Sequence, residues 1–317
     1  MRRTSLDMVY ALAKKDPRVV FIGSDLGPGV LEDMRAEMPK RFFMEGVSEA
    51  NIIGMAAGLA MDGFIPYVNT IATFLTRRCM EQISMDLCLH NLPVRLIANG
   101  GGLVYAPLGP THIAIDDIGL MRTQPNMTIV APSDAAEMKQ LMPETLEWDG
   151  PMYIRLGKGG DPILSKSDPA FKIGRGVIIR PPAKITLAAS GIMSSKAVDA
   201  ANILNTRGIY CGVVHFPTIK PLDVEMVNSL AEISDVIITL DEHLLNNGLG
   251  TAILETLNDT SSAHLPTIKR LGIRDQFTRH YGSQDTLLEE FGLQPYQIAD
   301  EVDRTARECL AVGGGMR

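Results

Sequence analysis

Three short motifs place side chains that can do chemistry among small or turn-forming residues. Glu49 ends the motif GVSE, His112 ends the motif GPTH, and Phe74 lies in the segment NTIATFLTR. A carboxyl group and an imidazole can both exchange a proton with a bound molecule, and the imidazole does so near neutral pH. The ordinary alternatives are an acid that complements a helix dipole, a structural histidine and a core aromatic residue.

The segment 46–63 (GVSEANIIGMAAGLAMDG) predicts a buried helix that begins at Glu49. Ser48 is a suitable N-cap, and the residues that follow are apolar on every side of the helix. Gly54 and Gly58 leave little side chain, so another backbone could approach closely. Glu49 would then lie at the mouth of a core helix, aimed at a bound molecule or complementing the dipole. The spacing alone leaves both interpretations open.

The composition indicates a globular protein of two domains. The chain has 317 residues, 45% of them apolar and 21% charged, and a net charge of −7. The acidic balance argues against a nucleic-acid partner, and no apolar stretch is long enough for a membrane span. The N-terminal segment is amphipathic and predicts a first helix rather than a signal peptide. Four widely spaced cysteines, without a CxxC pair, predict a reduced cytoplasmic protein with no structural metal site.

The first half of the chain alternates short apolar runs with helical patterns, which predicts a parallel sheet covered on both faces. The predicted strands are 19–22, 42–44, 65–68, 94–98, 127–130 and 152–156. Leu75, Cys79, Ile83 and Leu87 form one helical stripe, and Ser133 would cap a helix over 134–148. Ligands bind beyond the carboxyl ends of such strands, so Asp25, 69–73 and 99–102 should lie on the functional rim.

The second half predicts a smaller domain of the same class with a mixed sheet. Its expected strands are 185–188, 210–214, 236–240 and 267–271, and its expected helices are one capped by Ser194 and ending at Gly208, then 249–257, 286–291 and 296–309. A stretch rich in Gly, Pro, Lys and Ser precedes it. The predicted organisation is therefore two doubly wound α/β domains, 1–160 and 183–311, with a linker at 161–182 and a flexible tail at 312–317.

GVSEANIIGMAAGLA resembles the pyrimidine-binding segment of the transketolase family of thiamine diphosphate enzymes, and GPTH matches that family's histidine loop. The resemblance runs from about Arg2 to Thr305. It implies that Glu49 hydrogen-bonds the aminopyrimidine ring of the cofactor and favours the imino tautomer, which removes the thiazolium proton. It also implies that His112 contacts the donor and acceptor sugars. Glu49 and His112 are thus the expected catalytic residues.

The same resemblance assigns further residues to the cofactor and the substrate. Phe74 matches an aromatic residue that stacks on the aminopyrimidine, Ile71 stands where another aromatic is common, and Arg77 matches an arginine of several members. Asp25 matches an acidic residue at the cofactor site that spans the family's dimer. Arg155 matches an arginine that often binds the substrate phosphate, and Arg2 is a second candidate.

Two positions depart from the family pattern. Leu108 stands where typical transketolases have an aspartate that binds a substrate hydroxyl, and Gly100 stands where many have a phosphate-binding histidine. Tyr105 and Leu108 would line the altered wall. We therefore expect a phosphorylated or otherwise anionic sugar that differs from xylulose 5-phosphate near the reacting carbons. The GGG sequence at 100–102 could cradle an anion or be a flexible rim loop.

The resemblance covers only the second half of a full transketolase. The family's diphosphate and metal motif, GDG followed by an Asn, has no match here, since Gly160-Asp161-Pro162 lacks the second glycine. The Mg²⁺ ligands should therefore come from an N-terminal partner subunit that carries GDG…N, in an α2β2 heterotetramer. The expected function is that of the C-terminal subunit of a split transketolase, active only with that partner.

Three alternatives remain open. The β subunit of a 2-oxo acid dehydrogenase has similar length and a similar glutamate, and a deoxyxylulose-phosphate-synthase-like enzyme is related. A non-catalytic relative that binds a partner is the least favoured, because Glu49, Phe74 and His112 are all retained. The histidines of the second half are expected to be non-catalytic, including His243 in the motif Asp241-Glu242-His243.

Overall fold

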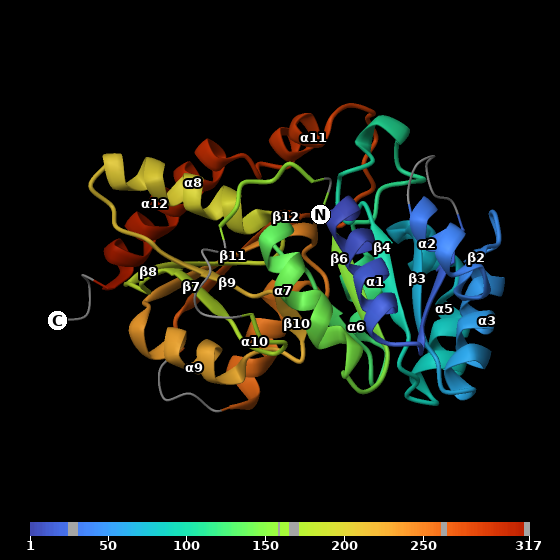
Figure 1. The fold of residues 1–317 in the computed structure, drawn as a ribbon. Coiled ribbons are helices and arrows are strands. Elements are labelled where there is room, and N and C mark those ends of the chain that lie inside the picture. Colours follow the sequence, from blue (N-terminus) through green and yellow to red (C-terminus); the bar gives the residue numbers. More distant parts are fainter. Residues whose placement is uncertain (25–30, 158, 165–170, 261–264, 314–317) are drawn as a thin grey trace.

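Two sheets lie side by side and organise the chain (Figure 1). The structure, a computed structural model of the 317-residue chain, describes residues 1–24, 31–157, 159–164, 171–260 and 265–313. The first sheet has seven strands in the order β10-β5-β6-β4-β3-β1-β2 and is parallel except at β10. Its strands are β1 (Val19–Gly23), β2 (Phe42–Met44), β3 (Ile65–Ile71), β4 (Arg95–Asn99), β5 (Thr128–Val130), β6 (Met152–Leu156) and β10 (Thr218–Lys220).

Helices cover both faces of the first sheet, as the buried strands require. On one face α1 (Arg2–Lys15) and α7 (Ala135–Leu146) pack against each other and the sheet. The other face is covered by α3 (Glu49–Met61), α4 (Ala72–Arg78), α5 (Met80–Gln82), η2 (Ile83–Cys88) and α6 (Asp117–Arg122). The predicted stripe of Leu75, Cys79, Ile83 and Leu87 is fully buried there, which confirms that prediction. Shorter helices are α2 (Glu32–Glu37), η1 (Pro39–Arg41) and η3 (Ala106–Leu108).

The second sheet has five strands in the order β12-β11-β8-β9-β7 and is mixed, because β7 is antiparallel to β9. Its strands are β7 (Val177–Arg180), β8 (Ile185–Ala189), β9 (Gly212–His215), β11 (Val236–Leu244) and β12 (Thr267–Ile273). Two buried clusters, one on each side, join it to α8 (Met193–Thr206), α9 (Val224–Ile233), α10 (Leu249–Asp259), α11 (Gln284–Glu290) and α12 (Pro295–Gly313). The predicted fold class, two α/β domains with the smaller one mixed, is confirmed.

Two strands lie where the sequence did not predict them. β7 falls inside the predicted linker and pairs with β9. β10 comes from the second half of the chain but adds to the first sheet, antiparallel to β5, and its Ile219 is buried in the core there. The two halves are therefore joined by a shared sheet edge as well as by the connector. The predicted flexible tail overlaps the end of α12, and residues 314–317 lie outside the described part.

Two predicted helix caps are wrong. Asp134, rather than Ser133, caps α7, because its carboxylate accepts hydrogen bonds from the backbone of Ala136 and Glu137. Ser194 lies inside α8, and its hydroxyl contacts Nδ1 of His215 at 2.6 Å instead of a helix terminus. Both predicted caps were of suitable residue types, so the error lies in the residue at which each helix begins.

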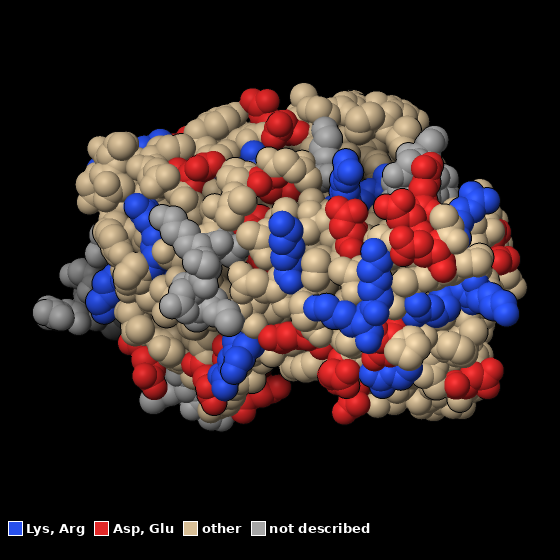
Figure 2. Space-filling view, viewed as in Figure 1, with Lys and Arg blue, Asp and Glu red and all other residues tan. Residues whose placement is uncertain are grey.

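Acidic and basic side chains are intermixed on the face shown in Figure 2, over both domains. Among the described helices, none is both long and apolar enough to cross a membrane.

Candidate active site

Glu49 is the first residue of α3 and is almost completely buried, with 5% of its surface exposed. Ser48 holds the N-cap position, as predicted, but its hydroxyl donates to the carbonyl of Glu45 and accepts no hydrogen bond from the backbone N–H groups at the helix terminus. The carboxylate of Glu49 instead accepts a hydrogen bond from Nη1 of Arg78 at 3.2 Å. The buried Glu49 carboxylate, at the start of a core helix, is thus bonded to a half-exposed arginine.

Phe74 and Arg78 lie one helical turn apart on α4, the spacing at which side chains stack along a helix. The guanidinium carbon of Arg78 lies 3.8 Å from the centre of the Phe74 ring, a cation–π contact. The same ring meets His112 edge-on, with the ring centres 5.0 Å apart and the planes at 62°. The structure therefore brings Glu49, Phe74 and His112, predicted from three separate motifs, to one place.

The His112 loop is held by residues of both domains. Gly109 has φ +77°, and a side chain there would meet the ring of Tyr281, which lies beyond β12, at 2.5 Å. Nδ1 of His112 is 2.9 Å from the hydroxyl of Thr111, so Thr111 orients the imidazole beside Phe74. A glycine is required at 109 by conformation and by contact, since L side chains rarely adopt this φ.

The Gly100 departure has a structural reason. Gly100 has φ +73°, and a Cβ there would lie 2.1 Å from the ring of Tyr105. Any side chain at this position, including a histidine, would have to displace that aromatic ring. Tyr105 is half-buried and Leu108 is half exposed at the end of η3. The two residues that were expected to form the altered wall are close in the chain and on the same loop, and their role in substrate binding stays a prediction.

Two buried polar atoms on the rim have no hydrogen-bond partner within the described part of the chain. They are Oγ1 of Thr73, beside Phe74 on α4, and Oδ1 of Asn99, at the end of β4. Nδ2 of Asn99 donates to Asn69, and Ile71 is its register partner on β3. Such unpaired atoms are uncommon in protein interiors and are satisfied when a polar group approaches.

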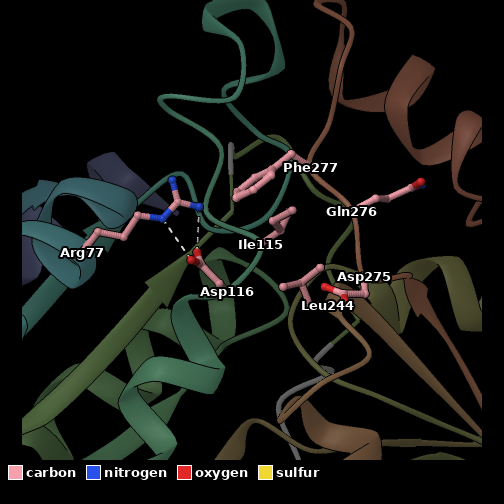
Figure 3. A pocket seen from close by; sticks show the side chains of 7 residues that line it. All are labelled: Arg77, Ile115, Asp116, Leu244, Asp275, Gln276 and Phe277. Carbon is pink, nitrogen blue, oxygen red and sulfur yellow. Dashed lines mark hydrogen bonds and ion pairs between the residues drawn. The ribbon is translucent and has the colours of Figure 1, made fainter.

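Arg77 turns away from Glu49. Its guanidinium forms an ion pair with Asp116 at 2.9 Å and lines a cavity of about 140 Å³ at the junction of the domains. Figure 3 shows Arg77 and Asp116 on one side of this cavity and Phe277 beside them. The predicted cofactor role of Arg77 is thus not supported by a contact with Glu49 or Phe74, and it stays a prediction.

Arg155 is buried at the end of β6 and bonded on several sides. It forms an ion pair with Asp117 at 2.8 Å and donates to the carbonyls of Ala114 and Glu242. Tyr153 donates a further hydrogen bond to Asp117. Burial acts to lower the pKa of Arg155, but the Asp117 carboxylate more than offsets this and the pKa is raised. These contacts tie the domains together, and the predicted contact with a substrate phosphate remains untested.

The remaining predicted residues are placed as follows. Ile71 ends β3 and is half-buried, which suits an apolar wall. Arg2 begins α1. Asp25 lies outside the described residues. Arg78 was missed by sequence reasoning, although its position four residues after Phe74 was the available signal.

The chain is similar in sequence to transketolases over almost its whole length. Residues 1–160 match the pyrimidine-binding domain of transketolase, and residues 174–298 match the transketolase C-terminal domain. A 6-deoxy-6-sulfo-D-fructose transketolase subunit, SqwH, from Clostridium sp. (strain MSTE9) is 33% identical over 97% of this chain and 94% of that protein. A 1-deoxy-D-xylulose-5-phosphate synthase from Microcystis aeruginosa is 36% identical over 92% of this chain, which spans about half of that protein, 46%.

Solved structures give the same picture. A chain described as a split-gene transketolase in an inactive β4 tetramer superposes with a TM-score of 0.87 and 33% identity, covering 96% of this chain and 97% of that one. A transketolase mutant from Pichia stipitis superposes with a TM-score of 0.81 over 99% of this chain and 46% of its own length. Its identity of 20% makes this second likeness one of fold alone.

Proposed function

Because this chain belongs to the transketolase family and is a C-terminal subunit of the split kind, we propose that it serves an enzyme that moves a two-carbon ketol unit between a ketose and an aldose. Transketolases depend on thiamine diphosphate. The observation that carries the proposal is that the buried Glu49 carboxylate and the Phe74 ring both face the same flat cationic group, the Arg78 guanidinium.

The residues present fit the aminopyrimidine of thiamine diphosphate. Arg78 shows that a planar, nitrogen-bearing group can lie over Phe74 and donate to Glu49 at the same time. The buried unpaired oxygens of Thr73 and Asn99 lie on the same rim, where a polar ligand could satisfy them. Ile71 would add an apolar wall at the end of β3.

The cofactor supplies the electron sink for breaking and forming a carbon–carbon bond. This chain's residues would hold and orient the reacting groups. Glu49 would share a proton with a ring nitrogen, and Phe74 would fix the ring by stacking. His112, held against Phe74, would donate a hydrogen bond or a proton to a substrate oxygen.

A second subunit would complete the site. The sequence has no GDG…N motif, and Mg²⁺ requires oxygen ligands that the partner chain would supply. The relative in the β4 tetramer is described as inactive, which suits a chain that needs a second polypeptide. We propose an assembly of two such chains and two partners, in the cytoplasm, with Asp25 near the contact between subunits.

The substrate we propose is a phosphorylated or otherwise anionic sugar. A relative that matches along nearly its full length is named for 6-deoxy-6-sulfo-D-fructose, an anionic sugar without a phosphate. Gly100 cannot become the histidine of other transketolases without moving Tyr105. Leu108 cannot accept a hydrogen bond from a sugar hydroxyl, and an apolar wall discriminates between substrates by only about 1–3 kcal/mol. These departures favour a donor unlike xylulose 5-phosphate near the reacting carbons, bound through Arg155 and Arg2.

The second candidate is condensation of pyruvate with an aldose phosphate, as in a deoxyxylulose-phosphate synthase. It is favoured by the 36% identity to that synthase over 92% of this chain. Both candidates use Glu49 and His112, so they differ in the donor, a ketose or a 2-oxo acid.

Reconstitution with the partner subunit tests the proposal. Thiamine diphosphate binding is measured by calorimetry with and without Mg²⁺, for this chain alone and for the pair. Turnover is then measured with ketose phosphates, sulfo-ketoses and pyruvate as donors, for wild type and Leu108→Asp. We expect cofactor binding and ketol transfer by the pair only. Tight Mg²⁺-dependent binding by the single chain would refute the divided site, and turnover with pyruvate alone would favour the synthase. Ordinary efficiency on xylulose 5-phosphate, unchanged by Leu108→Asp, would contradict the substrate assignment.

A further inference from the structure

Arg78 stands out among the arginines near the site because of what it touches. Arg77 pairs with Asp116, and Arg155 pairs with Asp117, so both bond to carboxylates outside the Glu49 cluster. Arg78 contacts Glu49 and Phe74, the two residues that fit the cofactor's aminopyrimidine. Its own side chain is 49% exposed, although the Glu49 side chain is only 5% exposed. A half-exposed cation therefore covers a buried carboxylate and an aromatic face.

The contacts of Arg78 exclude those of a stacked ring. Its guanidinium carbon is 3.8 Å from the centre of the Phe74 ring, so it fills the space over that face that a stacked ring, with its centre about 4.5–7 Å away, would need. Its Nη1 donates a hydrogen bond to Oε2 of Glu49 at 3.2 Å. An aminopyrimidine that stacks on this face of Phe74 and bonds this carboxylate cannot do so until the guanidinium has left.

We propose that Arg78 is a placeholder for the cofactor's aminopyrimidine, and that it must swing out before thiamine diphosphate can bind. This inference rests on the proposed function. Like the imino form of the aminopyrimidine, the guanidinium is planar, carries N–H donors and can stack, so one pair of residues accepts either. Arg78 thus keeps the buried carboxylate paired in a subunit without cofactor and competes with the cofactor for it.

The fold makes the placeholder removable. An ion pair with a half-exposed arginine contributes little, because water and salt compete for the exposed charge. The buried carboxylate is different, since leaving it unpaired is costly. Arg78 can therefore leave at low cost once another donor takes its place, but it should not leave before. The arrangement favours exchange of one planar donor for another over an open, unpaired Glu49.

Cofactor affinity should reveal this competition. The apparent dissociation constant rises in inverse proportion to the fraction of molecules with the site open. Removing the guanidinium by Arg78→Ala should therefore tighten thiamine diphosphate binding to the reconstituted pair, on the order of tenfold for a site open about one-tenth of the time. The gain should appear in the association rate and not in the dissociation rate, because Arg78 is absent from the bound state's contacts.

The experiment compares wild type, Arg78→Ala and Arg207→Ala, each paired with the partner subunit. Arg207 is the matched control, since it forms a 2.8 Å ion pair with Asp300 in the other domain. Calorimetry gives the affinities, and stopped-flow protein fluorescence gives both rate constants. Thermal unfolding of the single chain provides a readout without cofactor. There, Arg78→Ala should lower the midpoint, and the double variant with Glu49→Gln should recover it, because no buried charge is then left unpaired.

Each outcome decides between the ideas. A tighter Arg78→Ala complex with faster association, and an unchanged Arg207→Ala, supports the placeholder. Unchanged affinity overturns it, and weaker affinity with faster dissociation also overturns it by making Arg78 a cofactor ligand. If neither wild type nor Arg78→Ala binds thiamine diphosphate in the pair, the proposed function fails and the placeholder fails with it. If Arg78→Ala leaves the thermal unfolding midpoint of the single chain unchanged, Arg78 is not needed to pair the buried Glu49 carboxylate.

Discussion

Two arginine–carboxylate pairs in this protein have similar chemistry and opposite surroundings. At the rim, Arg78 pairs with Glu49, and the arginine side chain is 49% exposed. At the domain junction, Arg155 pairs with Asp117, and their side chains are 9% and 0% exposed. Within the described residues, the guanidinium of the rim arginine contacts one carboxylate and one aromatic ring, while the junction arginine also donates to two carbonyls. The Arg78–Glu49 pair can therefore be exchanged for another partner, whereas the Arg155–Asp117 pair is fixed by its surroundings.

The junction is a continuous polar network rather than a single pair. Glu242 accepts hydrogen bonds from the backbone of Leu103 and from Gln284, and Nε2 of His243 lies 3.1 Å from the backbone nitrogen of Gly119. Asp241 accepts from the first two backbone N–H groups of α10. All three side chains of the motif Asp241-Glu242-His243 therefore bond inside the fold.

The largest effect should come from Glu49→Gln. Glutamine keeps the size of the side chain but cannot hold the shared proton, so turnover of the reconstituted enzyme should fall by about 10²–10⁴-fold. Folding should be retained, since the amide still accepts a hydrogen bond from Arg78. Steady-state kinetics checks the loss, and thermal unfolding of the single chain checks the fold. Near-normal turnover would remove Glu49 from the catalytic residues and leave it as a buried helix-terminal acid.

The next effect should come from Asp117→Ala, and it should be one of stability. Removing one partner of a buried ion pair leaves an uncompensated charge and typically costs about 3–5 kcal/mol. Here Arg155 would lose the charge of its carboxylate partner while keeping its two carbonyl acceptors, and the hydroxyl of Tyr153 would lose its bond to Asp117. The control is Asp235→Ala, which breaks the exposed pair with Lys184 and should cost less than about 1 kcal/mol. Denaturant unfolding measures both, and equal losses would mean that the junction pair is no more important than a surface one.

The elements and motif residues that depend on local sequence were predicted well. Strand β6 has the predicted bounds, and α3 begins at Glu49 as predicted, because apolar runs and a polar turn define these elements locally. Glu49, Phe74 and His112 were each found from their own motif, and the fold brings them together. The secondary structure and the motif role of a residue can be predicted where both are set by residues nearby in the chain.

The parts that failed depend on neighbours far away in the chain. β10 is three residues long and becomes a strand only because β5 offers a free edge. Arg155 was expected to bind a substrate phosphate, but it pairs with Asp117, a partner that tertiary packing brings to it. Arg78 was passed over because nothing in α4 alone reveals that Glu49, on another helix, points at it. Roles that require two distant elements to meet were the ones that sequence reasoning missed.

Phe74→Ala and His112→Ala should separate cofactor binding from turnover. Loss of the Phe74 ring removes a stacking surface worth about 0.5–1.5 kcal/mol, which weakens cofactor affinity by roughly 2- to 12-fold. His112→Ala should leave affinity nearly unchanged and lower turnover, because His112 meets Phe74 only edge-on. Calorimetry and steady-state rates on the same samples test the pair of variants. The reverse pattern would exchange the roles of the two residues.

The smallest effect, from Glu242→Gln, tests whether the junction needs charge at all. Burial raises the pKa of Glu242 more than Arg155, Gln284 and the Leu103 backbone lower it. A carboxyl group whose folded pKa lies above its unfolded value of 4.5 stabilises fully below that value. This contribution is lost as the pH rises through the folded pKa, by roughly 1.4 kcal/mol for each unit of the shift.

Glutamine does not titrate, and its side-chain oxygen can still accept the Leu103 hydrogen bond. Relative to wild type, Glu242→Gln should therefore be least favourable near pH 4 and improve as the pH rises to 8, where it should be neutral or stabilising. Urea unfolding at a series of pH values measures this, with Glu255→Gln as the exposed control. A Glu242→Gln variant that loses stability as the pH rises would mean that the ionised carboxylate is favoured at the junction, as it is in Asp117, whose pKa the Arg155 guanidinium holds below its usual range despite burial. The junction would then be stabilised by ionised Glu242 as well as by ionised Asp117. The junction and the Arg78–Glu49 pair at the rim would then differ only in how exposed their charged side chains are.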